Sequence, residues 1–485
     1  MSSEAQYAQW PQLALSQHIF NLTNSYASRT TQQASAKAVQ DAIAEHKMAP
    51  LYRYLAHPTE GALHAAADES VLGSSLSGKP SLTRKSSLLG MIAGKSSTAS
   101  AYLPWDESLY VKLKSENDAE LEGYKNEEEE AVEKAGDIEI VAARGKRAEF
   151  WARVGDKDRA IAAYEEVIEK TGMLGTKIDI VLAIIRMGLF FGDKALVKKH
   201  VSRAKTLVES GGDWDRRNRL KAYEGVHLLT VRSHNLAAPY LLDSLETFTS
   251  YELCSYSSLV TYSVLAGAVS LKRVDFKSKV VDAPQVKAVM GDGEDRLMAL
   301  SLDEKAPVTG TDVPASKRGV VNLATLNSGE EIETETTTDF SALATLVSAL
   351  YTGNYKAFFQ SLAQVEEQFL NQDRYLLEHK NWFIREMRLR AYQQLLQSYR
   401  VVGLETMAHD FGVTVEFLDR DLAKFIAAGR IPCTIDRVNG KGVIETNRPD
   451  TKNKQYQDVV RQGDHLITKL QKYGQAVRLR GSERA

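Results

Sequence analysis

The feature that most restricts the fold of this chain is a short turn, made of glycine and a polar residue, that recurs between amphipathic segments. It occurs at Gly155-Asp156, Gly192-Asp193 and Gly353-Asn354, and in a weaker form at Ser233-His234. On both sides of each turn, apolar residues recur every three or four positions, which is the spacing of a helix face. Helix pairs joined in this way bury their apolar faces against neighbouring pairs. We therefore expect a mostly α-helical chain built as a right-handed, tetratricopeptide-like (TPR-like) helical-repeat solenoid.

Composition and charge are those of a globular chain and exclude several classes of protein. Of the 485 residues, 43% are apolar and 26% are charged, and the formal net charge is −2. Such a balance is ordinary for folded domains and unsuited to coating nucleic acid or an anionic membrane. Two cysteines, Cys254 and Cys433, are too few for a four-cysteine zinc site or a disulfide framework. Rare cysteine fits a reducing compartment, so we expect the protein in the cytoplasm and the nucleus.

One stretch resembles a membrane-spanning helix in its length and its lack of charged residues. Residues 253–271 contain no charged residue, but they contain six serine or threonine residues and two tyrosines. A helix that faces lipid rarely carries so many hydroxyl groups. We interpret the stretch as a buried helix of the repeat array, and we expect no membrane partner.

Two segments interrupt the helical pattern. Residues 72–100 hold eleven serine or threonine residues and no acid, and we expect a disordered insertion there. Residues 291–339 form a second polar segment, rich in glycine and threonine, and we expect a flexible insertion there. The expected organisation is a helical N-terminal segment (1–71), the serine-rich insertion (72–100), TPR-like repeats (101–290), the flexible insertion (291–339), the last repeats (340–400), a winged helix (401–450), and a C-terminal helix with its tail (451–485).

The sequence contains no complete match to a known catalytic motif. Residues 89–96 resemble a phosphate-binding loop, but Leu89 stands where the first glycine of that loop is required. The ten histidines are scattered without the spacing of a metal site. We therefore expect no enzyme activity, no catalytic, cofactor-binding or metal-binding residues, and no small-molecule substrate.

The strongest local pattern lies near the C-terminus. A short helix over 404–411 ends at Gly412, and Thr414 can cap a second helix over 415–428. Residues 431–435 and 443–446 then read as strands across a turn at 439–442. Two helices followed by a hairpin are the arrangement of a winged helix.

A winged helix raises the alternative of DNA binding. The helix that would enter the major groove, 415–428, has a formal charge of −1, whereas a helix that faces phosphates should be basic. We therefore favour a protein-contact module and expect nucleic acid to be an unlikely partner. Sheet edges can pair with strands of a neighbouring subunit. The interface residues predicted on this hairpin are Ile431, Ile435, Val443 and Ile444.

The final helix, expected over 455–477, carries an apolar seam. Together with Gly463 and Gly474, the residues Tyr456, Val460, Ile467 and Leu470 recur at alternating spacings of three and four, which suits packing against another helix. Two interpretations remain open: the helix folds back on its own domain, or it bundles with partner proteins.

A basic cluster occurs in the repeats. Arg216 and Arg217 lie close to Arg219 and Lys221. The cluster could bind an acidic neighbour, or it could form an intramolecular network with Asp213, Asp215 and Glu224. The pattern favours neither alternative.

A helical solenoid that runs into a winged helix and ends in an extended helix resembles the PCI family. Members of this family scaffold the proteasome lid, the COP9 signalosome and a translation initiation factor. The resemblance is closest to the lid members, and it is carried by residues 211–221, 248–254, 385–392, 425–430 and 444–450.

The resemblance implies a non-catalytic scaffold of the proteasome regulatory-particle lid that serves ubiquitin-dependent degradation. It implies contacts between PCI domains, a C-terminal helix in a bundle, and no cofactor. The implied partners are other lid subunits, of the PCI and MPN families, and base subunits. A scaffold like that of the COP9 signalosome is the alternative, and a DNA-binding winged helix is a weaker one.

Overall fold

The computed structural model describes residues 10–59, 61–63, 102–134, 136–291, 339–437, 442–447 and 451–482. The insertion predicted at 72–100, with its phosphate-loop-like string, lies outside these residues, as does all but the ends of the insertion predicted at 291–339. The expectations for both insertions and for the domain limits therefore stay predictions. The chain divides into two compact units. Unit one comprises Met1–Thr352 with Gln360–Met387, and unit two comprises Gly353–Phe359 with Arg388–Ala485.

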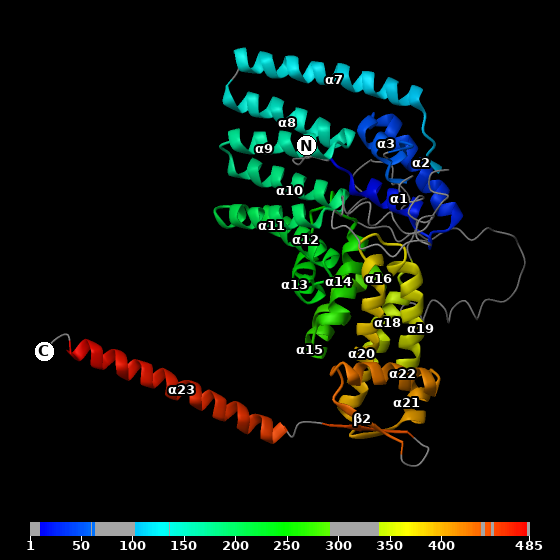
Figure 1. Ribbon diagram of the computed structural model, residues 1–485, viewed down its shortest axis with the longest axis vertical. Helices are drawn as coiled ribbons and strands as arrows, with labels where there is room; N and C mark the ends of the chain where they lie inside the picture. Colours follow the sequence, from blue (N-terminus) through cyan, green and yellow to red (C-terminus); the bar gives the residue numbers. More distant parts are fainter. Residues whose placement is uncertain are drawn as a thin grey trace, which may run out of the picture. The chain divides into compact units, whose positions relative to one another are not determined.

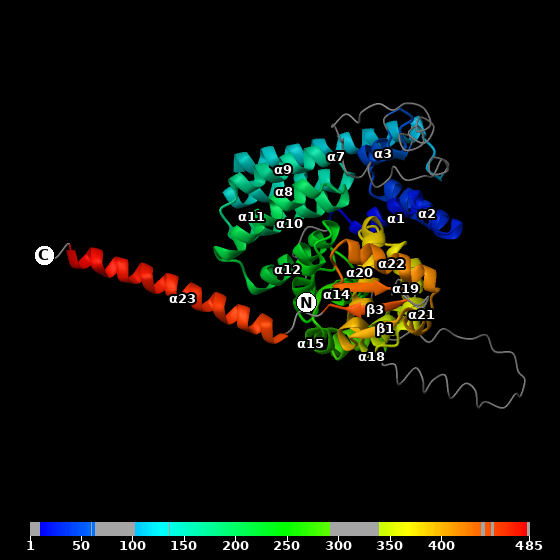
Figure 2. The same cartoon turned by 60° about the horizontal axis from the view of Figure 1, so that its bottom comes forward.

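Unit one consists of helices that pack against the next helix along the chain, as Figures 1 and 2 show for α7 to α11. The helices are α1 (Leu13–Thr23), α2 (Arg29–Glu45), α3 (Ala49–Ala56), α7 (Glu107–Lys134), α8 (Asp137–Val154), α9 (Lys157–Lys170), α10 (Leu174–Phe190), α11 (Lys194–Glu209), α12 (Trp214–Thr230), α13 (His234–Ser244), α14 (Tyr256–Ser270), α15 (Arg273–Phe276), α16 (Pro284–Met290) and α18 (Ser341–Thr352). A π-helical turn, η1 (Lys277–Val281), lies between α15 and α16. The N-terminal helices return to the array, because α3 packs on α7 and α8 and α1 packs on α10.

The recurring turns join the helix pairs for a local reason. Gly155 and Gly192 follow α8 and α10 with positive φ angles of 84° and 69°, which glycine adopts without steric cost. The next residue caps the following helix: Asp156 accepts the Arg159 N–H at 3.1 Å, and Asp193 accepts the Leu196 N–H at 3.0 Å. Each glycine-aspartate pair therefore ends one helix and begins the next.

Two helices form the inner layer of unit one. Every side chain of α10 from Val181 to Phe190 is buried, and so is every side chain of α14 from Leu259 to Ala268. In α14 the buried serine and threonine hydroxyls donate to carbonyls of their own helix, such as Ser263 to Leu259 at 2.7 Å. The buried helix predicted for 253–271 is therefore confirmed. No helix within the described ranges is both long and apolar enough to cross a membrane.

A polar segment, residues 366–380, ties distant parts of unit one together, and we call it the clasp. It contains a π-helical turn, η3 (Glu366–Leu370), and a short 3-10 turn, η4 (Leu377–His379). From α1, Gln17 donates to the carbonyl of Gln372 at 2.7 Å. Just after α1, Asn24 donates to the carbonyl of Asn371, also at 2.7 Å.

The clasp also reaches the inner helices. Arg374 donates to the carbonyl of Phe190 at the end of α10 at 3.0 Å, and a ring nitrogen of His379 lies 2.9 Å from the carbonyl of Thr230 in α12. The hydroxyl of Tyr262 in α14 donates to Asp373. Burial raises the pKa of this Asp373 carboxyl. The clasp thus satisfies helix-end carbonyls that would otherwise lack partners.

Unit two contains a three-stranded antiparallel sheet with two helices. The strands β1 (Val401–Gly403), β2 (Cys433–Asp436) and β3 (Val443–Thr446) lie in the order β1-β3-β2, with Ile444 opposite Val402 and Ile435. Figure 2 shows β1 and β3 side by side. The helices are α21 (Leu404–Phe411) and α22 (Val415–Ala427), followed after the hairpin by α23 (Thr451–Ser482); α19 (Tyr355–Val365) and α20 (Lys380–Ser398) each run from one unit into the other.

An aromatic cluster holds the core of unit two. The ring of Phe411 lies 4.6 Å from that of Tyr355 and 5.1 Å from that of Tyr392, measured between centroids. The buried Tyr392 hydroxyl donates to Asp421 at 3.2 Å. Burial raises the pKa of Tyr392, so this phenol stays a hydrogen-bond donor.

The predicted fold class is confirmed: helical repeats are followed by a winged helix and a terminal helix. Three elements of the winged helix, β1, β2 and α22, differ from the prediction. Strand β1 was not expected, and β2 begins at Cys433 instead of residue 431. The predicted limits of α21 agree with the structure, and α22 ends one residue earlier than predicted.

Burial of His234 makes the stability of unit one depend on pH. Its side chain is buried beside the ring of Trp382 (centroids 4.8 Å apart), and burial lowers its pKa to about 4. The unfolded value is about 6.5, so between these values the unfolded chain binds more protons and stability falls as pH falls. We expect His234→Gln to reduce the slope of the free energy of unfolding against pH. Across this window the slope should fall by up to about 1.4 kcal/mol per pH unit.

Denaturant titrations of both proteins from pH 4 to pH 8 measure this difference. Equal slopes below pH 6.5 would show that His234 is protonated in the folded state. His200 and His227, whose pKa values are also lowered by burial, contribute equally in both proteins.

Candidate interaction surfaces

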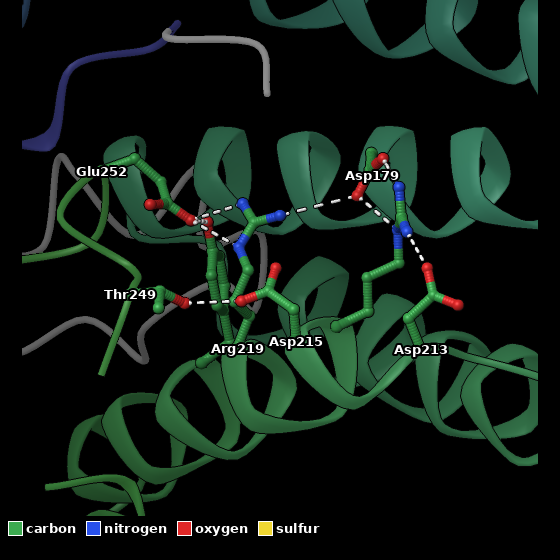
Figure 3. Close-up of polar contacts among 8 residues, drawn as sticks. Asp179, Asp213, Asp215, Arg219, Thr249 and Glu252 are labelled. Atoms are coloured by element: carbon green, nitrogen blue, oxygen red, sulfur yellow. Dashed lines mark hydrogen bonds and ion pairs between the residues drawn. The ribbon is translucent and has the colours of Figure 1, made fainter. Parts of the chain in front are cut away.

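Two residues of the basic cluster predicted in the repeats, Arg216 and Arg219, are part of a buried ion-pair network (Figure 3). Arg219, only 1% exposed, lies between two carboxylates, 2.6 Å from Glu252 and 3.5 Å from Asp179. One turn earlier on α12, Arg216 donates twice to Asp179, at 3.0 and 2.6 Å. The hydroxyl of Tyr223 donates to Glu252 at 3.0 Å.

The network keeps its charges although it is buried. Burial by itself would lower the pKa of Arg219, but Glu252 and the other surrounding groups hold it above its usual value. Burial raises the pKa of Asp179, and the hydrogen bonds from Arg216 oppose that shift. Burial also raises the pKa of Tyr223. Helices α10 and α12 and the connection that precedes α14 are therefore joined by charge pairs that water screens weakly.

The partners within the network differ from those expected. Asp213 pairs with Arg216 at 2.5 Å, as one alternative proposed, but Asp215 accepts from Thr249 at 2.9 Å. Glu224 pairs with Lys205 instead, at 2.6 Å. The main partners, Asp179 and Glu252, were not identified because they lie 37 and 33 residues away in the chain. Arg216 therefore forms its ion pairs within the protein.

Arg217 is the exposed member of the cluster. Its Nε donates to the carbonyl of Gly212 at 3.0 Å. The interface role of Arg216 and Arg217 stays a prediction.

The four interface residues predicted on the hairpin occupy two kinds of position. Ile431 and Ile444 are buried in the core of unit two, and Ile444 lies in the central strand. Ile435 and Val443 are half-buried. The edges of the sheet are β1 and β2, and Val401 in β1 is exposed. Contact with a neighbouring strand would therefore use an edge backbone, with Ile431 and Ile444 supporting it from inside.

The four residues of the C-terminal seam are all exposed on α23. Tyr456 is 70% exposed, Val460 62%, Ile467 54% and Leu470 68%. The exposed apolar set is larger than the predicted seam, and it also includes Val459, Leu466, Tyr473 and Val477. A strict alternation of three and four omits Val459, Leu466 and Tyr473, which lie along one side of the seam, whereas Val477 continues the alternation three residues after Gly474.

Among the described residues, no group of three or more histidine, cysteine or acidic side chains is placed to hold a metal ion.

Three parts of the chain match known families. Residues 106–279 match the family described as 26S proteasome subunit RPN7, and residues 359–446 match the PCI domain. Residues 455–477 match the C-terminal helix of the 26S proteasome regulatory subunit RPN7/PSMD6. The first match contains the ion-pair network, the second most of the winged helix, and the third the exposed stripe of α23.

Relatives from distant organisms match along nearly the whole chain. The chain is 35% identical to 26S proteasome regulatory subunit rpn7 of Schizosaccharomyces pombe over 97% of both chains. It is 36% identical to RPN7 of Saccharomyces cerevisiae, over 98% of this chain and 95% of the relative. It is 33% identical to the 26S proteasome non-ATPase regulatory subunit 6 homolog of Arabidopsis thaliana, over 99% of this chain and 100% of the relative. The chain therefore belongs to the RPN7 family of 26S proteasome regulatory subunits.

Proposed function

We propose that this protein is a non-catalytic scaffold subunit of the proteasome lid and serves ubiquitin-dependent degradation by holding other subunits in place. The observation that carries the proposal is the apolar face of α23, which is exposed along the described helix. An apolar stripe of this size is costly in water unless another protein covers it.

The width of the stripe indicates the kind of contact. Apolar residues at only two positions per heptad suit a two-stranded coiled coil. Here a third position recurs, at Val459, Leu466 and Tyr473, so the stripe is wider than about 100°. A stripe of that width can contact more than one helix at once. We infer that α23 packs within a bundle of helices from several subunits.

A second contact would use the winged helix. The short strands β1 and β2 leave backbone groups at both sheet edges, and Val401 presents an apolar side chain beside one of them. Such an edge can accept a strand from a neighbouring PCI domain. The inferred partners are lid subunits of the PCI and MPN families and base subunits, in the cytoplasm and the nucleus.

Affinity purification of two forms of the chain tests the function. The full-length protein and a form that ends at Asn453 are each tagged at the N-terminus, and their partners are identified by mass spectrometry. We expect the full-length chain to recover lid and base subunits and the truncated form to lose them, because the truncation removes the exposed stripe. Recovery of signalosome subunits by the full-length chain would instead assign the protein to that complex. Recovery of no stable partner would contradict the scaffold function.

A further inference from the structure

Three connections between helices form one continuous surface on unit one. They precede α10, α12 and α14, and we call them the loop ridge (residues 171–173, 210–213 and 245–255). The first two meet where a Cβ at Gly211 would lie 3.2 Å from Cδ2 of Leu174. The second and third meet where Thr249 donates to Asp215, at the start of α12, at 2.9 Å (Figure 3).

Each connection exposes one large apolar side chain at or beside it. Met173 is 60% exposed, Trp214 at the first position of α12 is 66% exposed, and Tyr251 is 71% exposed. One exposed apolar residue on a surface needs no explanation. Three exposed apolar residues on adjoining connections indicate a binding surface, because tryptophan, tyrosine and methionine are enriched where proteins bind one another.

The ridge is held in shape before any partner arrives. Arg216 and Arg219 fix the first turns of α12 to Asp179 of α10 and to Glu252 of the third connection. The ring of Phe248 lies 5.3 Å from that of Tyr251, between centroids, and supports it from one side. A pre-organised surface loses little conformational freedom on binding, so more of the contact energy appears as affinity.

The charge of the ridge indicates its partner. Within the connections and the helix turns that flank them, the exposed carboxylates are Glu169, Glu209, Asp213, Asp243 and Glu246. The exposed cations are Lys170 and Arg217. Because Arg216 and Arg219 are neutralised inside the network, the surface presents an excess of negative charge around its apolar centre. Of the two interpretations of the basic cluster, the internal network applies to Arg216 and Arg219.

We propose that the loop ridge binds a segment of a neighbouring subunit that carries apolar side chains flanked by lysine or arginine. The proposal rests on the scaffold function proposed above. The apolar side chains of that segment contact Met173, Trp214 and Tyr251, and its cations face the carboxylates at the rim. Rim charges of this kind set orientation and association rate, while the aromatic centre supplies most of the affinity.

Site-specific cross-linking in the assembled particle tests the proposal. A photoreactive phenylalanine replaces Trp214 in the full chain, the particle is purified and irradiated, and cross-linked peptides are identified by mass spectrometry. We expect cross-links to one segment of another subunit in which lysine and arginine outnumber acidic residues. The same group at Val274, an exposed apolar residue of unit one outside the ridge, serves as the control and should not cross-link to that segment.

Binding measurements with the cross-linked subunit then give the size of the effect. We expect Trp214→Ala to raise the Kd about tenfold to thirtyfold, and Asp243→Lys to raise it severalfold at low salt but little at high salt. Val274→Ala should leave the Kd unchanged.

Three results would overturn the proposal: cross-links to an acidic segment, cross-links only to α23 of the same chain, or no cross-link in a particle that contains the variant. Failure of the variant and of the unmodified chain to join the particle would contradict the scaffold function instead.

Discussion

Arg219→Ala is expected to lower the free energy of unfolding of unit one by about 3–5 kcal/mol. The substitution removes the cation that lies between Glu252 and Asp179 and leaves both carboxylates in a poorly hydrated place. It also removes the ion pair between α12 and the connection that precedes α14, and leaves the hydrogen bonds of Tyr223 to Glu252 and of Thr249 to Asp215 between them. Denaturant unfolding measures the loss, and hydrogen exchange should show that the amides of α12 lose protection first.

Two further variants separate this effect from simple loss of a charge. Arg217→Ala, at the exposed neighbour, should cost less than about 0.5 kcal/mol. Arg219→Met combined with Glu252→Gln removes both charges of the Arg219–Glu252 pair and should regain much of the stability, because no unpaired charge of that pair remains. If Arg219→Ala cost no more than Arg217→Ala, the buried network would have no part in stability.

Leu470→Asp is expected to weaken incorporation of the chain into the lid at least thirtyfold without unfolding either compact unit. Leu470 is exposed at the centre of the stripe on α23, so its loss costs the free chain little. In a bundle, a buried leucine contributes about 1.5–3 kcal/mol, and an unpaired carboxylate in its place adds a desolvation cost. A loss of about 2 kcal/mol corresponds to about thirtyfold in affinity. Competition between tagged and untagged chains during lid assembly measures the ratio.

His465→Asp is the matched control on the same helix. It introduces the same side chain one to two turns from Leu470, on the far side of α23 from the stripe, and shares any cost in helix propensity. It should compete almost as well as the unchanged chain. Equal incorporation of both variants would show that the stripe is not covered in the lid.

The winged helix could be predicted from the sequence because its signals are local. The apolar spacing within α21 and α22, the cap at Thr414 and the positive φ of Gly412 all act within a few residues of the helix ends. Strand β1 was missed for the opposite reason. It has three residues, and its partner β3 lies some forty residues further along the chain, so two adjacent valines were too short a signal to predict a strand.

The candidate surfaces also differ in whether their signal is local in the sequence. Exposure of Tyr456 and Leu470 follows from the periodicity of one helix, which a sequence displays directly. The charge of the loop ridge cannot be read from one helix, because it depends on which carboxylates face Arg216 and Arg219 once the repeats have stacked. Four adjacent basic or amide residues in a sequence suggest a positive surface, whereas the folded protein uses two of these arginines internally.

The clasp has a consequence for how the chain is made. Asn24 and its hydrogen-bond partner Asn371 are 347 residues apart, and Gln17 and Gln372 are 355 apart. At roughly 5–20 residues per second, a ribosome needs about 20 to 70 s to cover that distance. During this interval Gln17 and Asn24 lack these hydrogen-bond partners, although α1 can already pack on α10. Attachment of the first helices to the rest of unit one is therefore completed only late in synthesis, and a nascent chain that has not reached residue 366 lacks these hydrogen bonds.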